Sequence, residues 1–269
     1  MTSSAQLLHT ITDREYADFQ KLVFAISGIT LNQTKKPLLQ NRFQKRLRTL
    51  ALDSYGAYYQ LVMASAAEQQ IMLDLITTNE TRFFRESKQF HILTNRLPAL
   101  HDPKRSFRLW SAACSSGEEC YSLAMIIHDY RKDAPFQILG SDINQAVLAE
   151  AAQALYPIED AGQIPRYYRQ RYCLKGVRSM EGYFRIADSL KQNISFRQIN
   201  LNYSLPEIGN FDCIFLRNIF IYFSKDKQNE ILRRLYPRLA ENGLLFVGLS
   251  ETVNLDGFER IESSVYKKV

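Results

Sequence analysis

A pair of glutamates at the start of an expected helix is the part of this sequence that most clearly suggests chemistry. Glu118 and Glu119 follow a run of small residues and Gly117, which in turn follow an apolar, strand-like run over 107–110. A strand, a tight loop and a helix start form the arrangement by which open α/β sheets bind nucleotide-like ligands. Helix N-termini attract anions, but two carboxylates would repel a pyrophosphate. The pair therefore favours a ligand with positive charge.

Polar residues also end the next expected strands. Asp142 ends one strand-like run, where an acidic side chain is placed to hydrogen-bond a ribose diol; a helix N-cap is the alternative role for it. Asn200 and Leu201 end another run, where an amide suits an adenine edge. The sequence lacks the G-x-G-x-x-G pattern of dinucleotide sites. A ligand with a ribose, no phosphate and a positive charge is S-adenosylmethionine.

A further strand-like run ends in an arginine and an asparagine. The run over 211–216 passes into Arg217 and Asn218 and then into an aromatic stretch over 219–223. Packing does not easily explain this polar pair at a strand tip, so we expect both residues at the ligand site.

The alternation of strand-like and helix-like runs from residue 107 predicts an α/β fold with a mostly parallel sheet. The last two strand-like runs are joined by only 262–264, too short for a crossover, and are expected to form an antiparallel hairpin at the sheet edge. Two β-like runs around a glycine-bounded turn predict a small inserted antiparallel β-subdomain at about 170–190. The strand-like runs cover 107–112, 136–141, 195–200, 211–216, 244–249, 258–261 and 265–268, and the helix-like runs cover 117–130, 145–154 and 227–239.

Residues 13 to about 78 have the pattern of a helical bundle. Asp13 is the expected cap of the first helix and Gly28 its end. Three more helices are expected over 35–50, 54–63 and 67–77.

The expected helix over 35–50 has a basic side. Spacings of three and four bring its basic side chains together, and no Asp or Glu lies between residues 30 and 52. We expect this side to dock an acidic helix, and a solvated surface is the alternative. The residues concerned are Arg42, Lys45, Arg46 and Arg48.

Composition limits the possible classes of partner and compartment. The 269 residues include 34 Lys and Arg against 28 Asp and Glu, a formal charge of +6 with a pI near 9.1, which favours an acidic partner. The four cysteines show no C-x-x-C pair and no zinc-type spacing, which predicts free thiols, a reducing compartment and no metal site. No signal-peptide or membrane-span pattern is present in the sequence, and a cytoplasmic location is expected.

Four stretches resemble, in order and spacing, the signature stretches of the bacterial chemotaxis receptor methyltransferases, the CheR family. They are 79–86, 110–119, 141–143 and 217–223. The resemblance covers essentially the whole chain. It implies a helical N-terminal domain over 1–78, a linker over 79–106 that contributes to the cofactor site, and a Rossmann-like methyltransferase domain over 107–269 with a small β-subdomain. It also implies methyl transfer from S-adenosylmethionine to glutamates on cytoplasmic helices of chemoreceptors, with S-adenosylhomocysteine as product.

The resemblance also implies a role for individual residues. Tyr222 would lie near the transferred methyl group, and Tyr222 or Arg85 would orient the acceptor carboxylate. Glu119 and Asp142 would bind the charged and ribose parts of the cofactor. The other implied cofactor-binding residues lie in the linker and at strand ends: Asn79, Thr81, Arg85, Asn200, Leu201, Arg217 and Asn218.

Two departures from the family pattern remove no polar contact. Cys120 stands where proline is usual, and Leu216 stands where cysteine is common. Phe83, Phe84 and Phe220 are candidates, with Tyr222, to exclude water from the site. For the three phenylalanines, packing in the core is the alternative role.

The resemblance gives the basic helix and the β-subdomain candidate partners. The basic side of 35–50 would dock the glutamate-rich methylation helices of a receptor, and the β-subdomain would bind a receptor C-terminal tail by adding a strand. No membrane insertion is expected, and the protein is expected to be a monomer. Which receptor is used stays open.

Two other functions compete with this interpretation. A nucleic-acid methyltransferase on the same scaffold is suggested by the pI and by an Arg-Tyr stretch near residue 168. The sequence shows neither an Asn-Pro-Pro-Tyr run nor a recognisable catalytic cysteine for base methylation, so no nucleic-acid partner is expected. A cofactor-binding scaffold protein without activity is the third possibility, and the intact polar residues of the four stretches argue against it.

Overall fold

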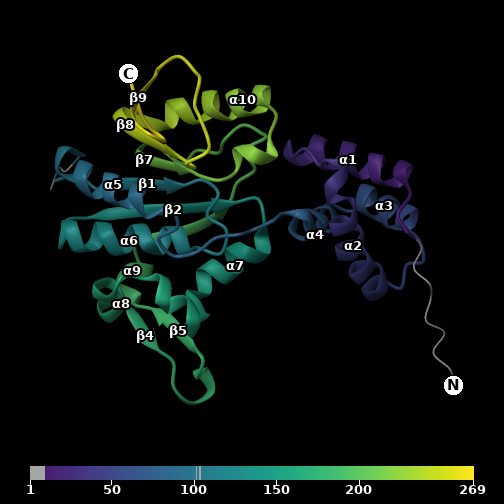
Figure 1. Ribbon diagram of the computed structural model, residues 1–269, viewed down its shortest axis with the longest axis horizontal. Coiled ribbons are helices and arrows are strands. Elements are labelled where there is room, and N and C mark those ends of the chain that lie inside the picture. The colour runs from purple at the N-terminus through teal and green to yellow at the C-terminus, as the bar shows by residue number, and fades with distance from the viewer. Residues whose placement is uncertain (1–9, 101, 103) are drawn as a thin grey trace. The chain divides into compact units, whose positions relative to one another are not determined.

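The computed structural model describes residues 10–100, 102 and 104–269. The chain divides into two units, one that ends at Thr78 and one that begins at Asn79 (Figure 1). Within the described residues, no helix combines the length and the apolar character that crossing a membrane requires.

The first unit is helical, and its first helix is capped at both ends. Thr12, rather than the expected Asp13, is the N-cap: its hydroxyl accepts from the Glu15 N–H at 3.2 Å, while the Glu15 carboxylate accepts from the Thr12 N–H at 2.9 Å. Gly28 ends the helix in the left-handed conformation, as expected. The elements are α1 (Asp13–Ser27), η1 (Gln33–Lys35), α2 (Lys36–Leu50), α3 (Tyr55–Ala64) and α4 (Ala66–Ile76).

Aromatic side chains form the centre of this helical unit. The ring of Phe43 on α2 lies 4.8 Å from that of Phe19 on α1 and 5.1 Å from that of Tyr58 on α3. All three side chains are fully buried. Helices α1, α2 and α3 therefore each contribute one of these rings to a common core, and this packing fixes which of their faces point outward.

The second unit contains a seven-stranded sheet in which five neighbouring strands are parallel. The last two strands of the chain pair antiparallel at one edge, which confirms the expected terminal hairpin. In spatial order the strands are β6 (Ile194–Gln198), β2 (Phe136–Asp142), β1 (Phe107–Ser111), β7 (Phe211–Leu216), β8 (Leu239–Val247), β10 (Val265–Lys268) and β9 (Phe258–Glu262).

Helices cover both faces of this sheet (Figure 1). Side chains on successive strand residues point to opposite faces, so Phe215 packs in one core with α5 and α6, and Ile214 packs in the other with α10. The helices of this unit are α5 (Ser87–Leu100), α6 (Glu118–Arg131), α7 (Gln145–Gln153), α8 (Arg166–Tyr172), α9 (Asp188–Lys191) and α10 (Lys225–Leu235), with short 3-10 turns η2 (Ile158–Gln163), η3 (Arg178–Met180), η4 (Phe220–Tyr222) and η5 (Tyr236–Arg238).

The β-subdomain is a separate three-stranded antiparallel sheet. The expected hairpin is present as β4 (Cys173–Lys175) and β5 (Tyr183–Ile186). A third strand, β3 (Leu155–Pro157), pairs with the other side of β5. Sequence inspection misses β3 because it has only three residues and follows α7 after a single residue.

The order of the strands determines where a ligand site forms. Strand β1 lies between β2 and β7, so the connections that leave β1 and β7 run toward different parts of the sheet. In open α/β sheets, such a switch point leaves a crevice at the carboxyl ends of the strands. The loops after β1, β2 and β7 therefore meet at the place where a ligand is expected.

Candidate active site

The guanidinium of Arg217, which follows β7, is buried and bound on several sides. Its side chain is 2% exposed, and its Nη1 donates to Glu119 Oε2 at 2.7 Å. Its Nη2 donates to Glu86 Oε2 at 3.1 Å and to the main-chain oxygen of Arg85. The guanidinium carbon also lies 5.5 Å from the centre of the Phe90 ring. One cation therefore joins the end of β7, the first turn of α6 and the segment before α5.

Glu86 receives hydrogen bonds from three neighbours. Besides Arg217, the Asn218 Nδ2 donates to Glu86 Oε1 at 3.0 Å, and the Leu249 N–H donates to Glu86 Oε2 at 3.2 Å. Burial alone would raise the pKa of Glu86, but the bond from Asn218 and the charge of Arg217 outweigh it and lower the pKa. Glu86 is thus ionised at neutral pH. The sequence analysis includes this residue in the stretch 79–86 but predicts no role for it.

The loop after β1 is tied to the segment at 79–86 and to the end of β2. Ser115 has a left-handed backbone with φ 49. Its N–H donates to Asp142 Oδ2 at 3.0 Å, and its hydroxyl donates to the main-chain oxygen of Asn79 at 3.1 Å. Three stretches that are distant in sequence therefore meet at one residue.

Asp142 does not act as a helix N-cap. The cap of α7 is Asn144, whose side chain accepts from the Val147 N–H at 3.1 Å. Asp142 instead accepts from the Ser115 N–H and, through Oδ1, from the Asn144 N–H at 3.0 Å. Its carboxylate lies at the tip of β2 and is 9% exposed.

The paired glutamates point in different directions. Glu119 accepts from the Ser111 hydroxyl at 2.6 Å and from Arg217. Glu118 accepts from the Ser116 hydroxyl at 2.8 Å, and burial raises its pKa. Consecutive helix residues are about 100° apart at 3.6 residues per turn, which agrees with the separate partners of the two carboxylates. The preference of the pair for a positively charged ligand stays a prediction.

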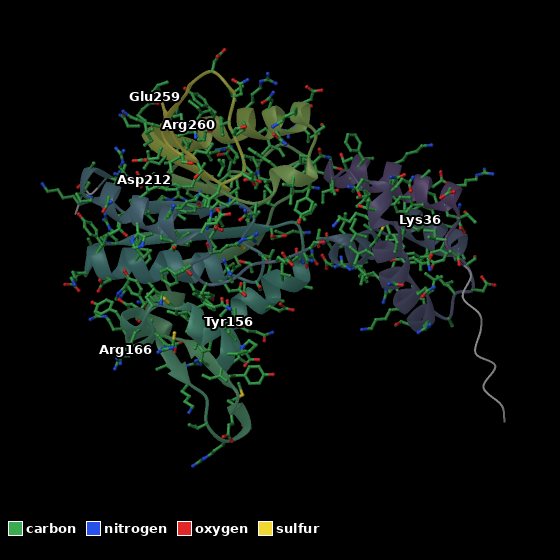
Figure 2. The ribbon with its side chains drawn as sticks, in the orientation of Figure 1. Lys36, Tyr156, Arg166, Asp212, Glu259 and Arg260 are labelled. Carbon is green, nitrogen blue, oxygen red and sulfur yellow. The ribbon has the colours of Figure 1, made fainter. Side chains whose placement is uncertain are left out.

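Gly117 is required by protein packing. Its φ is +95, and an added Cβ would lie 2.8 Å from the Cβ of Ala151 and 3.1 Å from the Tyr156 hydroxyl. Tyr156, labelled in Figure 2, donates from this hydroxyl to the main-chain oxygen of Ser116 at 2.7 Å. The glycine therefore allows the loop to pack against α7 and β3.

Tyr222 and Arg85, the two candidate catalytic residues, interact electrostatically. Tyr222 is half-buried in η4, and burial raises its pKa; the charge of Glu80 raises it further, and the charge of Arg85 lowers it. The phenol is therefore protonated at neutral pH and able to donate a hydrogen bond. Arg85 itself donates from Nη1 to the main-chain oxygen of Glu80.

The loop after β6 lies beside the end of β2. The Ile199 N–H donates to the main-chain oxygen of Asp142 at 3.1 Å. Asn200 Oδ1 then accepts from the Asn202 N–H at 3.0 Å, and Leu201 is buried. Asn200 and Leu201 are thus next to Asp142. Thr81 is half-buried in the segment that also contains Asn79 and Arg85.

The phenylalanines expected to exclude water belong to the core. Phe83 is 2% exposed and packs edge-on against Tyr156 at 4.9 Å. Phe84 stacks on Tyr168 at 5.6 Å, and Phe220 is buried in the core on the α10 face. Phe83 and Phe220 are buried and Phe84 is half-buried, which agrees with the alternative role of core packing. Exclusion of water from the site by these rings stays a prediction.

The four basic residues of α2 divide into two pairs. Arg42 donates to the main-chain oxygens of Leu75 and Thr77 at 2.7 and 2.9 Å, and Arg46 makes two hydrogen bonds to Glu68 at 2.8 and 2.6 Å. These partners lie on α4 or directly after it. The sequence analysis does not predict these contacts of Arg42 and Arg46, because it counted acids only within the local stretch, and docking by the four residues stays a prediction.

The other two basic residues, Lys45 and Arg48, are exposed on α2. They are the part of the expected docking side that faces solvent in the described structure.

Family models match nearly the whole chain. Residues 79–267 match the model described as CheR methyltransferase, SAM binding domain, and residues 14–77 match the one described as CheR methyltransferase, all-alpha domain.

Curated relatives agree with these matches. The chain is 37% identical over 248 residues to the chemotaxis protein methyltransferase of Salmonella typhimurium, which covers 90% of this chain and 84% of that protein. It is 37% identical over 259 residues to the Escherichia coli chemotaxis protein methyltransferase, which covers 93% and 87%. It is 36% identical over 245 residues to chemotaxis protein methyltransferase 2 of Pseudomonas aeruginosa, which covers 89% and 87%.

Replacement of Glu86 by Gln is expected to lower the free energy of unfolding by about 1–3 kcal/mol at pH 7, because an amide leaves donors of Arg217, Asn218 or Leu249 unmatched. The pKa of Glu86 is lowered on folding, so the stability it contributes is present above its unfolded pKa of about 4.3 and is lost as the pH falls through the lower folded value. The deficit of the variant is therefore expected to shrink below about pH 4.3 in urea unfolding. Glu241→Gln, at an exposed glutamate, is the control; an equal deficit in both variants would contradict the assigned network.

Proposed function

The chain belongs to the CheR methyltransferase family, and from this premise we propose that it methylates glutamate side chains of chemoreceptors with S-adenosylmethionine. The products are glutamate methyl esters and S-adenosylhomocysteine. One observation carries the proposal: the four stretches expected to form the site meet at the carboxyl ends of β1, β2 and β7, through Ser115 and Arg217.

The residues at these strand ends fit S-adenosylmethionine. The Asp142 carboxylate at the tip of β2 is proposed to accept hydrogen bonds from the ribose hydroxyls. Glu119 places negative charge next to Ser111, which suits a ligand with a sulfonium and an ammonium group. Asn200 and Leu201, beside Asp142, are proposed to face the adenine.

The remaining cofactor contacts are proposed for the segment before α5. Asn79, Thr81 and Arg85 would hold the methionyl end. Arg217 is proposed to act indirectly, because its side chain is 2% exposed and already bound by two carboxylates. It would hold Glu119 in place, and Asn218 would do the same for Glu86.

The acceptor needs no general base. A glutamate with a pKa of about 4.3 is already ionised at neutral pH. Bound S-adenosylmethionine supplies an electrophilic methyl group. The protonated hydroxyl of Tyr222 and the guanidinium of Arg85 are proposed to donate hydrogen bonds to the acceptor carboxylate and to align it. Alignment of two reactants at close range is worth several kcal/mol of the barrier.

Lys45 and Arg48 are proposed to dock the acidic methylation helices of the receptor. Both are exposed, whereas Arg42 and Arg46 are bound within the helical unit. Exposed charges act mainly by steering and by weak pairing in water, so this contact should be sensitive to salt.

A receptor C-terminal tail is a second proposed contact, at the β-subdomain. Strand β4 is an edge strand of the three-stranded sheet. Leu174 on β4 is 51% exposed, and Val177 after it is 70% exposed. An extended peptide could add a strand at this edge and place apolar side chains on these residues.

The proposed reaction is tested with labelled S-adenosylmethionine and either receptor cytoplasmic fragments or RNA. We expect label on the receptor fragment that is released by mild base, because carboxyl methyl esters hydrolyse. Base-stable label on RNA, with none on the receptor fragment, would contradict the proposal.

Replacement of Tyr222 by Phe is expected to lower turnover by about 10-fold or more, because the hydroxyl that aligns the acceptor is lost. The dissociation constant for S-adenosylmethionine is expected to stay nearly unchanged. Tyr130→Phe, at a surface tyrosine of α6, is the matched control. Wild-type turnover in the Tyr222 variant would remove this residue from the mechanism.

Reversal of both exposed charges, Lys45→Glu with Arg48→Glu, is expected to raise the KM for receptor fragments, with a defect that is largest at low salt. Binding of S-adenosylmethionine should be unchanged. The control is Arg14→Glu with Lys21→Glu, which changes the net charge equally at exposed positions of α1. An equal defect in the control would show a general charge effect and would exclude a docking site on α2.

A further inference from the structure

Glu251, a buried residue shortly after β8, lies outside the four family stretches and binds main-chain groups of two loops. It is 6% exposed. Its Oε2 accepts from the Gly248 N–H at 2.7 Å and from the Asn218 N–H at 3.0 Å, and its Oε1 accepts from the Phe220 N–H at 2.7 Å. One side chain thus holds the loop after β7 against the loop after β8.

The loops after β7 and β8 approach each other closely at Asn218 and Gly248. Asn218 has a left-handed φ of 59. An added Cβ on Gly248 would lie 2.8 Å from Asn218 Nδ2 and 2.9 Å from Glu251 Oε2. The two loops therefore approach so closely that only glycine fits at 248 without a shift.

The 3-10 turn that contains Tyr222 begins at Phe220, the residue whose N–H donates to Glu251. Phe220 opens η4, and its N–H is bound by Glu251. On the other side of the turn, Gln228 of α10 donates to the main-chain oxygens of Phe220 and Phe223 at 2.8 and 3.0 Å. The backbone on either side of Tyr222 is thus fixed by two buried side chains.

We propose that Glu251 is a positioning residue for methyl transfer, which holds η4 so that the Tyr222 hydroxyl is directed at the acceptor carboxylate. This inference rests on the proposed function, in which Tyr222 aligns the acceptor. Glu251 acts through the main chain of residues 218–220 and does not itself contact cofactor or substrate.

Both carboxyl oxygens of Glu251 are needed as acceptors for this role. Replacement by Gln keeps the volume but turns an NH₂ group toward main-chain N–H donors, either at Phe220 or at Asn218 and Gly248. Two donors that face each other cannot bond. The turn is then expected to relax, and small displacements of an aligning group cost up to about 100-fold in rate.

A double-mutant cycle separates this role from a general effect on stability. The four proteins are the full-length wild type, Glu251→Gln, Tyr222→Phe and the double variant. We expect Glu251→Gln to lower kcat on receptor fragments by about 10-fold, with the dissociation constant for S-adenosylmethionine changed less than about 3-fold. In the Tyr222→Phe background, the same change is expected to have little further effect, because residues that act as a unit are not additive.

Two outcomes would overturn the inference and leave the proposed role of Tyr222 intact, provided that Tyr222→Phe alone still lowers turnover. One is an equal loss of kcat from Glu251→Gln in both backgrounds, and the other is wild-type kcat in Glu251→Gln. Wild-type turnover of Tyr222→Phe would instead overturn the proposed role of Tyr222. Amide hydrogen exchange gives a readout that does not depend on activity: the amides of 218 and 220 should exchange faster in Glu251→Gln, and unchanged exchange would contradict the contact.

A second variant covers the case in which Glu251→Gln does not fold. Glu251→Asp keeps the charge but withdraws the carboxylate by one methylene, so it is expected to lower kcat while S-adenosylmethionine binding is kept. Wild-type kcat in this variant would count against the positioning role. Glu241→Gln, at an exposed glutamate of β8, serves as the control for both variants.

Discussion

The buried ion pairs of Arg217 hold the methyltransferase unit together at its functional end. Removal of two charges from water costs several kcal/mol per ion, and only well-placed partners offset it. Glu86 and Glu119 provide this offset from two different elements, so the segment before α5 and the start of α6 must be ordered together with β7. The Arg217 Nε is buried without a hydrogen-bond partner within the described structure. Apolar groups of similar volume are often as stable as such an incompletely satisfied network, so stability alone explains it poorly. The network is consistent with the proposed role of Glu119 at the cofactor site.

Glu86 and Glu251 bind the same two loops but differ in their partners. Burial would raise the pKa of either carboxyl group. Glu86 faces Arg217 and the amide of Asn218, and its pKa is lowered, whereas Glu251 faces main-chain N–H groups, and its pKa is raised. Asn218 joins the two, since its side chain donates to Glu86 and its N–H donates to Glu251. Burial raises the pKa of Glu251 in spite of its main-chain donors, whereas at Glu86 the hydrogen bond from Asn218 and the charge of Arg217 outweigh burial. The geometry of the loops depends on both carboxyl groups.

Apolar patterns predict the sheet well and the site only in part. The strands Phe211–Leu216 and Val265–Lys268 end at the expected residues. Phe211–Leu216 is buried on both faces, which gives a mostly apolar run with sharp limits. The helix α5 is not predicted, although Phe90, Leu93 and Leu97 have helical spacing. The linker predicted over 79–106 covers these residues. The pairing of Arg46 with Glu68 depends on tertiary contact across 22 positions. Glu251 leaves no sequence signal, because its partners are main-chain amides that every residue type but proline has.

The proposed reaction explains why charged groups at this site are already paired. A carboxylate and a sulfonium become a neutral ester and a neutral thioether, so strong stabilisation of either charge before transfer would raise the barrier. Glu119 shares its charge with Arg217 and accepts from Ser111, which weakens its hold on a cation without removing it. Arg85 is used in part by the main chain of Glu80. In the proposed reaction, the main remaining contribution of the protein is to align the reacting atoms. The hydrogen bonds that hold the backbone on either side of Tyr222 are consistent with this proposed role.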